Sequence, residues 1–144
     1  FENAAPDKIQ SIIPSNVIYL NDSDVTIEGI KLWGSPVTPW FHDWAFNRNR
    51  GADIQKHWDL IPADAGIVIT HGPAYGILDK TVYGEHVGCM DFLKKMETVK
   101  PRYHICGHIH EAYGAFEHNG TTWINASVLD SKYRRCNEPV ILFY

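Results

Sequence analysis

Three histidines follow the ends of two short apolar segments in a pattern that favours metal chemistry. His71 comes directly after the apolar run 66–70, and His108 and His110 come just after residues 102–106. In open α/β sheets, ligand sites form at the carboxyl ends of parallel strands. If the two segments are neighbouring parallel strands, the three imidazoles converge on one crevice. Such a set suits a borderline divalent ion such as zinc, manganese or iron.

The small residues beside these histidines fit a site for two metal ions. Gly107 allows a sharp exit from the second strand, and a tight turn there can direct His108 and His110 toward two neighbouring points. His-x-His alone arises by chance in a chain with eight histidines, so the pair without His71 favours a structural role. The remaining histidines are predicted to be structural or solvent-exposed, with one at the start of a helix: His42, His57, His104, His118 and, at the helix start, His86.

The elements that position the histidines are predicted from apolar periodicity and from turn residues. Strands are expected at 17–20, 25–27, 30–33, 66–70, 102–106, 112–117, 121–125 and 139–144, and helices at 52–60 and 87–99. Asn119-Gly120 predicts a hairpin turn between two of these strands. The strand, loop, helix and strand between 66 and 106 resemble a βαβ unit with a parallel pair. Residues 34–51 read as a long loop that carries several aromatic side chains.

Composition and charge narrow the class of protein. The chain has 144 residues, of which 44% are hydrophobic and 21% charged, as in one globular domain. A net charge of -4 gives no reason to expect nucleic-acid or anionic membrane binding, and the basic group Lys132, Arg134 and Arg135 is typical of a solvated loop. Three cysteines without Cys-x-x-Cys spacing favour a reducing, cytoplasmic location. Because Phe1 replaces an initiator Met, we expect a piece of a longer polypeptide.

Two motifs carry a family resemblance. Thr-His-Gly-Pro at 70–73 and Gly-His-Ile-His at 107–110 resemble the last two metal motifs of the calcineurin-like metallophosphoesterases, in their usual order and separation. The segments 34–36, 111–114 and 124–127 resemble more narrowly the branch of small metallophosphoesterase-domain proteins. The resemblance extends over essentially all 144 residues.

The resemblance implies a fold and a chemistry. It implies an α/β fold in which 1–144 form the C-terminal half of the family's α/β sandwich, a mixed sheet with parallel core strands and a C-terminal antiparallel portion. His71 and His108 would ligate one of two divalent metal ions (manganese, iron or zinc), and His110 the other. A water activated by the metals would hydrolyse a phosphodiester or phosphomonoester.

The sequence departs from the family in what it lacks. The Asp-x-His, Gly-Asp and Gly-Asn-His motifs that supply the remaining ligands are absent, and neither Asp7 nor Asp22 lies in a matching motif. We therefore assign no catalytic residue in this chain and expect the isolated chain to hydrolyse phosphoesters negligibly. A half sheet exposes an edge and an apolar face, so we expect binding to the missing N-terminal half or self-association.

Other interpretations stay open. The chain could be a non-enzymatic half-module that binds a metal or a nucleotide and pairs with another chain. Trp40 and Phe41 could line the pocket of a nucleotide-like substrate by stacking, or could pack onto the core. The metallo-β-lactamase and cupin folds also use His-x-His, but the residues that should follow the pair in those folds are absent after His110.

Overall fold

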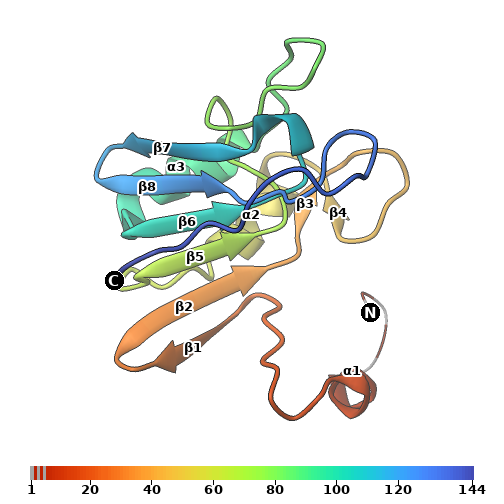
Figure 1. The fold of residues 1–144 in the computed structure, drawn as a ribbon. Helices are drawn as coiled ribbons and strands as arrows, with labels where there is room; N and C mark the ends of the chain where they lie inside the picture. The colour runs from red at the N-terminus through yellow and green to blue at the C-terminus, as the bar shows by residue number, and fades with distance from the viewer. Residues whose placement is uncertain (1, 3, 5) are drawn as a thin grey trace.

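The centre of the computed structural model is one mixed sheet of six strands in the order β1-β2-β5-β6-β8-β7 (Figure 1). The structure describes residues 2, 4 and 6–144, so Phe1 and the side chain of Asp7, both considered above, lie outside the described residues. The strands of this sheet are β1 (Ser23–Ile27), β2 (Ile30–Ser35), β5 (Ile67–Thr70), β6 (Tyr103–Cys106), β7 (Gly114–His118) and β8 (Thr121–Asn125). A separate short pair joins β3 (Thr38–Pro39) to β4 (Asn47–Arg48).

The four inner strands are parallel, and the two outer pairings are antiparallel. β2, β5, β6 and β8 run in one direction, whereas β1 pairs antiparallel with β2 and β7 pairs antiparallel with β8. This confirms the predicted α/β class with parallel core strands and a C-terminal antiparallel portion. The arrowheads of the inner strands point to the same side (Figure 1), so the residues that follow them meet at one edge of the sheet.

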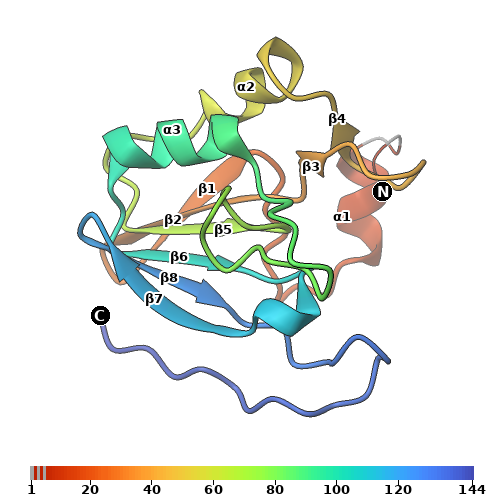
Figure 2. The ribbon, with the colours of Figure 1, turned by 90° about the horizontal axis from the view of Figure 1, so that it is seen from above.

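Two helices cover one face of the sheet (Figure 2). They are α2 (Ala52–Trp58) and α3 (Met90–Val99), which lie side by side, while α1 (Pro6–Ile12) stands apart from the sheet and was not predicted. Alternate residues of each strand face the helices, since side chains alternate across a strand. The resulting core is apolar and aromatic, with members from the sheet and from both helices: Trp33, Val68, Trp123, Ile54, Trp58, Phe92 and Met96.

Most predicted elements are confirmed, with ends shifted by one or two residues. The strands at 66–70 and 102–106 are the parallel neighbours β5 and β6, and Asn119-Gly120 makes the hairpin turn between β7 and β8. Both residues of that turn have positive φ, 52° at Asn119 and 82° at Gly120, as a two-residue hairpin turn requires.

The predicted start of the second helix is wrong. α3 begins at Met90, where the Cys89 Sγ atom accepts a hydrogen bond from the Phe92 N–H, and His86 lies outside it. Residues before Met90 are extended because Cys89 pairs with Ala74 and His86 pairs with Lys80. A Cβ atom at Gly88 would collide with the backbone of Ala74, so this close pairing requires glycine.

Two predicted strands, 17–20 and 139–144, are also wrong. Both segments are rich in strand-forming residues, but neither forms a β-strand in the part of the chain that the structure describes. Residues with high strand propensity suit a pleated, half-buried surface, but a strand also needs a neighbouring strand to pair with. The last segment lies across the uncovered face of the sheet, where the Phe143 carbonyl accepts hydrogen bonds from the Tyr103 hydroxyl at 2.6 Å and from Arg102 at 3.2 Å (Figure 1).

A buried histidine links the core to the strand ends. His104 of β6 is 1% exposed and lies between the rings of Phe92 and Trp123. Its Nε2 atom is 2.8 Å from the Thr70 hydroxyl, which donates to the Gly72 carbonyl. Nε2 is therefore the donor in the first of these bonds. Burial lowers the pKa of His104 to about 3.

We expect His104 to make folding sensitive to acid. The unfolded chain binds a proton at this residue below about pH 6.5, but the folded chain does so only near pH 3. The free energy of unfolding should therefore decrease as the pH is lowered from about 6.5 to about 3, by up to about 1.4 kcal/mol per pH unit. His104→Gln keeps a donor for Thr70 and does not titrate. Urea unfolding of this variant should show a smaller decrease from about pH 6 to 4, and equal slopes would contradict the assignment.

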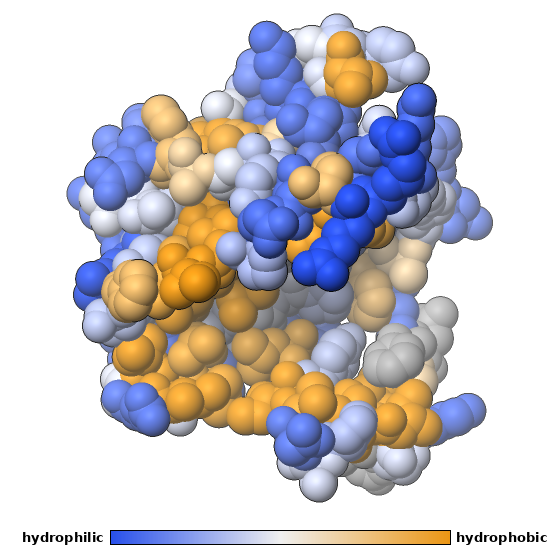
Figure 3. All heavy atoms as spheres, viewed as in Figure 1, coloured by the Kyte–Doolittle hydropathy of each residue, from blue (hydrophilic) through white to orange (hydrophobic). Residues whose placement is uncertain are grey.

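The face of the sheet opposite the helices is apolar and only partly covered. Ile67, Ile69 and Ile105 point to this face and are partly exposed, and Ile141 and Phe143 of the last segment are 77% and 80% exposed. Apolar atoms extend over much of this side (Figure 3). Contiguous exposed apolar surface of this kind marks an interaction site.

We therefore expect the chain to self-associate or to bind a second polypeptide through this face. Size-exclusion chromatography with light scattering should give a mass above 16.4 kDa that returns toward the monomer in Ile141→Glu combined with Phe143→Ser. Tyr83→Ser is the matched control, since Tyr83 is 86% exposed on a distant loop. A folded monomer would argue against self-association.

Candidate functional site

Two of the three predicted metal ligands are in contact. His71 follows β5 and His108 follows β6 by two residues, and the His71 Nε2 atom lies 3.1 Å from the His108 Nδ1 atom. The Gly107 N–H donates to the His71 carbonyl at 3.1 Å, which extends the β5–β6 pairing past the strands. A Cβ atom at Gly72 would make an ordinary van der Waals contact with the His108 ring at 3.8 Å, so this approach does not require glycine there. The parallel pairing thus brings the two imidazoles together as predicted.

A tight turn at His108 directs the two histidines of the motif differently. His108 has φ of +70°, and the Ile109 N–H donates to the Gly107 carbonyl at 2.8 Å, the pattern of a γ-turn. A non-glycine residue in this region is strained, and such residues cluster at functional sites. His110 begins a short 3₁₀-helix, η1 (His110–Ala112), and its Nδ1 atom lies 2.9 Å from the Asp130 carbonyl.

The pKa values of the two paired imidazoles are lowered. Burial lowers the pKa of His71, and burial with the nearby His71 and His110 rings lowers the pKa of His108 to about 4. Both rings are therefore neutral at pH 7. Neutral imidazole is the form that binds a metal ion.

The geometry of the pair fits one divalent ion. Two nitrogens that are each about 2.05 Å from a tetrahedral metal lie roughly 3.3 Å apart, close to the 3.1 Å observed. A complete site needs at least one further ligand, and the described residues contain no group of three or more His, Cys, Asp or Glu side chains that could hold a metal. Asp22 is engaged elsewhere, with Ser35 at 2.6 Å and His57 at 2.7 Å. The roles of His71, His108 and His110 as metal ligands therefore stay a prediction.

The histidines line a pocket of about 880 Å³ with an aromatic wall. Trp40 and Phe41, the residues predicted to line a substrate pocket, both face it, and Trp40 is 65% exposed. The rings of Phe41 and Trp44 lie 6.2 and 6.4 Å from that of His108. These side chains are not packed into the core, so the alternative that they pack onto it is not supported. They are available to contact a bound molecule.

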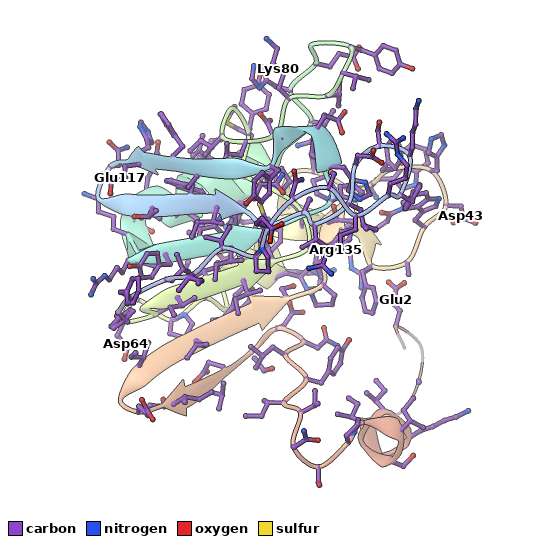
Figure 4. The ribbon with its side chains drawn as sticks, in the orientation of Figure 1. Glu2, Asp43, Asp64, Lys80, Glu117 and Arg135 are labelled. Carbon is purple, nitrogen blue, oxygen red and sulfur yellow. The ribbon has the colours of Figure 1, made fainter. Side chains whose placement is uncertain are left out.

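The aromatic wall is held by polar contacts at both ends. Glu2 accepts hydrogen bonds from the Phe46 N–H and from Arg48, each at 2.7 Å, and Arg48 lowers the pKa of Glu2 (Figure 4). At the other end Arg50 donates to the Val87 and Gly88 carbonyls at 2.9 and 2.7 Å. The loop between β3 and β4 is thereby tied to the segment that precedes α3.

Three residues that shape the site were not predicted as site residues: Asn125, Asp79 and His86. Asn125, at the end of β8, is fully buried, and its amide donates to the Ile109 carbonyl at 2.8 Å, between the two histidines of the motif. Asp79 is also fully buried and contacts His86, which lines the pocket. The local signal for Asn125 is its position as the last residue of the predicted strand 121–125. No local signal connects Asp79 with His86.

The fold and the site together define a class of protein: an α/β protein in which the parallel strands end at a histidine-lined pocket. No protein-family model matches the sequence. Human metallophosphoesterase domain-containing protein 1 is 43% identical over 138 residues, covering 94% of this chain and 42% of the human protein. UPF0046 protein T07D4.2 of Caenorhabditis elegans is 39% identical over 128 residues, covering 88% of this chain and 32% of that protein.

The similarity to these relatives, which extends over 88 to 94% of this chain, supports placing it in a metallophosphoesterase-domain branch. The chain spans about two fifths of the length of the human relative. A solved crystal structure matches with a TM-score of 0.55 at 18% identity, covering 75% of this chain and 45% of that one, which supports the fold. Within the part of the chain that the structure describes, no helix is both long and apolar enough to cross a membrane.

We expect the isolated chain to bind one Zn²⁺ ion through His71 and His108. Zinc titration followed by NMR should shift the imidazole signals of these two residues together. His71→Ala should weaken binding by at least about tenfold, since loss of even an indirect partner of a ligand has an effect of that size. His118→Ala, an exposed histidine outside the pocket, is the matched control. Unchanged zinc affinity in His71→Ala would remove His71 from the ligand set.

Proposed function

We propose that this chain supplies part of the active site of a metal-dependent phosphoester hydrolase. The observation that carries the proposal is the pair of neutral imidazoles, His71 and His108, with facing nitrogens 3.1 Å apart at the ends of β5 and β6. Similarity to metallophosphoesterase-domain proteins supports the same chemistry. The ligands that are absent among the described residues would come from another polypeptide segment.

Each residue of the chain would have a limited task in this reaction. His71 and His108 would hold one divalent ion, and His110 would face a second. Bound manganese, iron or zinc would lower the pKa of water and neutralise charge on the phosphoryl oxygens. Asn125 and the Thr70–His104 pair would hold the two histidine-bearing turns in place, through hydrogen bonds to the Ile109 and Gly72 carbonyls.

The aromatic wall favours a phosphoester with a flat apolar group, such as a nucleotide. Trp40, Phe41 and Trp44 are 65%, 47% and 55% exposed and lie along the pocket that contains His108. Exposed aromatic rings beside a site for a phosphoryl group can stack on a base, an interaction that tolerates different bases. Their position supports a nucleotide-like substrate over a small inorganic one.

A second candidate function is a catalytically inactive module that binds a metal or a nucleotide and pairs with another chain. One observation favours it: the described residues offer two facing imidazoles but no carboxylate within reach of both. Two cations close together repel each other unless an anion is shared between them. The same residues would then retain a ligand without activating water.

Reconstitution distinguishes the two candidates. We expect the isolated chain with Mn²⁺ to hydrolyse bis(p-nitrophenyl) phosphate at the background rate. Addition of the part of the human relative that this chain does not cover should raise the rate at least about tenfold, and His71→Ala in that assembly should return it to background.

Each alternative outcome is informative. Robust manganese-dependent turnover by the 144-residue chain alone would contradict a partial site. An assembly that forms and binds metal but has no turnover on mono- or diesters would favour the inactive module.

A further inference from the structure

A second histidine site lies in the same pocket, away from the paired imidazoles. Asp79 is 0% exposed, and its Oδ2 atom accepts hydrogen bonds from the Gly76 and Gly88 N–H groups, each at 2.9 Å. Its Oδ1 atom lies 2.6 Å from the Nδ1 atom of His86. Two backbone donors on one oxygen stabilise the carboxylate form, so the His86 Nδ1–H donates to Asp79. The other ring nitrogen, Nε2, is left without a partner in this cluster.

The His86 ring is fixed in position but open to the pocket. Arg50 binds the Val87 and Gly88 carbonyls, and Gly88 lies against the backbone of Ala74, so the segment is held on two sides. The side chain of His86 is nevertheless 41% exposed. Since it belongs to no group of metal-ligating side chains among the described residues, its Nε2 atom is available to a bound molecule.

The charged side chains around His86 favour binding of an anion by its ring. Asp79 lies beneath the ring as a buried counter-ion, and Arg50 adds a positive charge to the pocket. Lys80 pairs with His86 through the backbone and lies on the loop that rises beyond β7 (Figure 4). Glu111 also lines the pocket, with its Oε1 atom occupied by the Val82 N–H, and the Tyr75 ring lies 5.8 Å from that of His86.

We propose that His86 is a substrate-contacting residue. With its Nδ1–H on Asp79, the protonated ring donates its Nε2–H to an anionic oxygen of the phosphoester in the pocket. Asp79 is the positioning residue, because it fixes the ring orientation and the tautomer. The assignment rests on the proposed function for its substrate class, but the contact itself requires only a tetrahedral anion and no metal.

The test is metal-free binding of sulfate, a tetrahedral dianion that keeps its charge between about pH 5 and 8. In the presence of a chelator, sulfate should shift the Nε2 resonance of His86 in ¹⁵N NMR. His86→Asn retains a donor at the position of Nδ1 and lacks Nε2, so it should keep the thermal stability and lose about tenfold in affinity. His118→Asn, outside the pocket, should bind as the unmodified chain does.

Asp79→Asn tests the positioning role. The amide oxygen can still accept from the two backbone N–H groups, but its NH₂ group then faces Nδ1 and moves the ring proton to Nε2 in the neutral form. The ¹⁵N shifts of the two ring nitrogens should exchange, and unchanged shifts would show that Asp79 does not set the tautomer. If this variant fails to fold, His86→Asn alone decides the outcome.

Failure of this inference differs from failure of the proposed function. Unchanged sulfate affinity in His86→Asn, or a His86 resonance that ignores sulfate, would overturn the contact whatever the assembly hydrolyses. In an active assembly, His86→Asn should raise KM about tenfold with a smaller effect on kcat. An assembly without turnover would reject the proposed function and leave the sulfate result standing.

Discussion

The parallel register of β5 and β6 is the constraint on which the site depends. Ile67 lies opposite Tyr103 and Ile69 opposite Ile105, and this pairing continues to the hydrogen bond from Gly107 to the His71 carbonyl. A slip of one residue would turn every side chain of a strand to the other face. It would take His104 out of the core as well as separate the paired imidazoles. The packing of the core and the geometry of the pocket are therefore set by the same hydrogen bonds.

The pocket is assembled from segments that are far apart in sequence. Its aromatic wall comes from the loop between β3 and β4, its histidines from the ends of β5 and β6, and His86 from the segment before α3. Hydrogen bonds join these segments directly, as from Arg50 to the Gly88 carbonyl and from the Gly51 N–H to Asp91. The scaffold therefore fixes the spacing between the aromatic wall and His86.

Local signals in the sequence account for what could be predicted. The apolar run 66–70, the Asn119-Gly120 turn and the helical spacing up to Val99 each depend on neighbours in the chain, and each appears in the structure. The contact between Asp79 and His86 depends on the conformation of the residues between them, which the two residue types do not predict. The strand predicted at 139–144 is wrong for the opposite reason, since its residues suit a strand but pair with no strand among those that the structure describes.

Two requirements conflict at His108: the γ-turn favours glycine, whereas the pocket contains the imidazole of this residue. A glycine would adopt φ of +70° without the side-chain strain that histidine bears there. Selection for thermal stability alone would favour His108→Gly, which removes an imidazole from the pocket. The backbone here is therefore preorganised at the expense of stability.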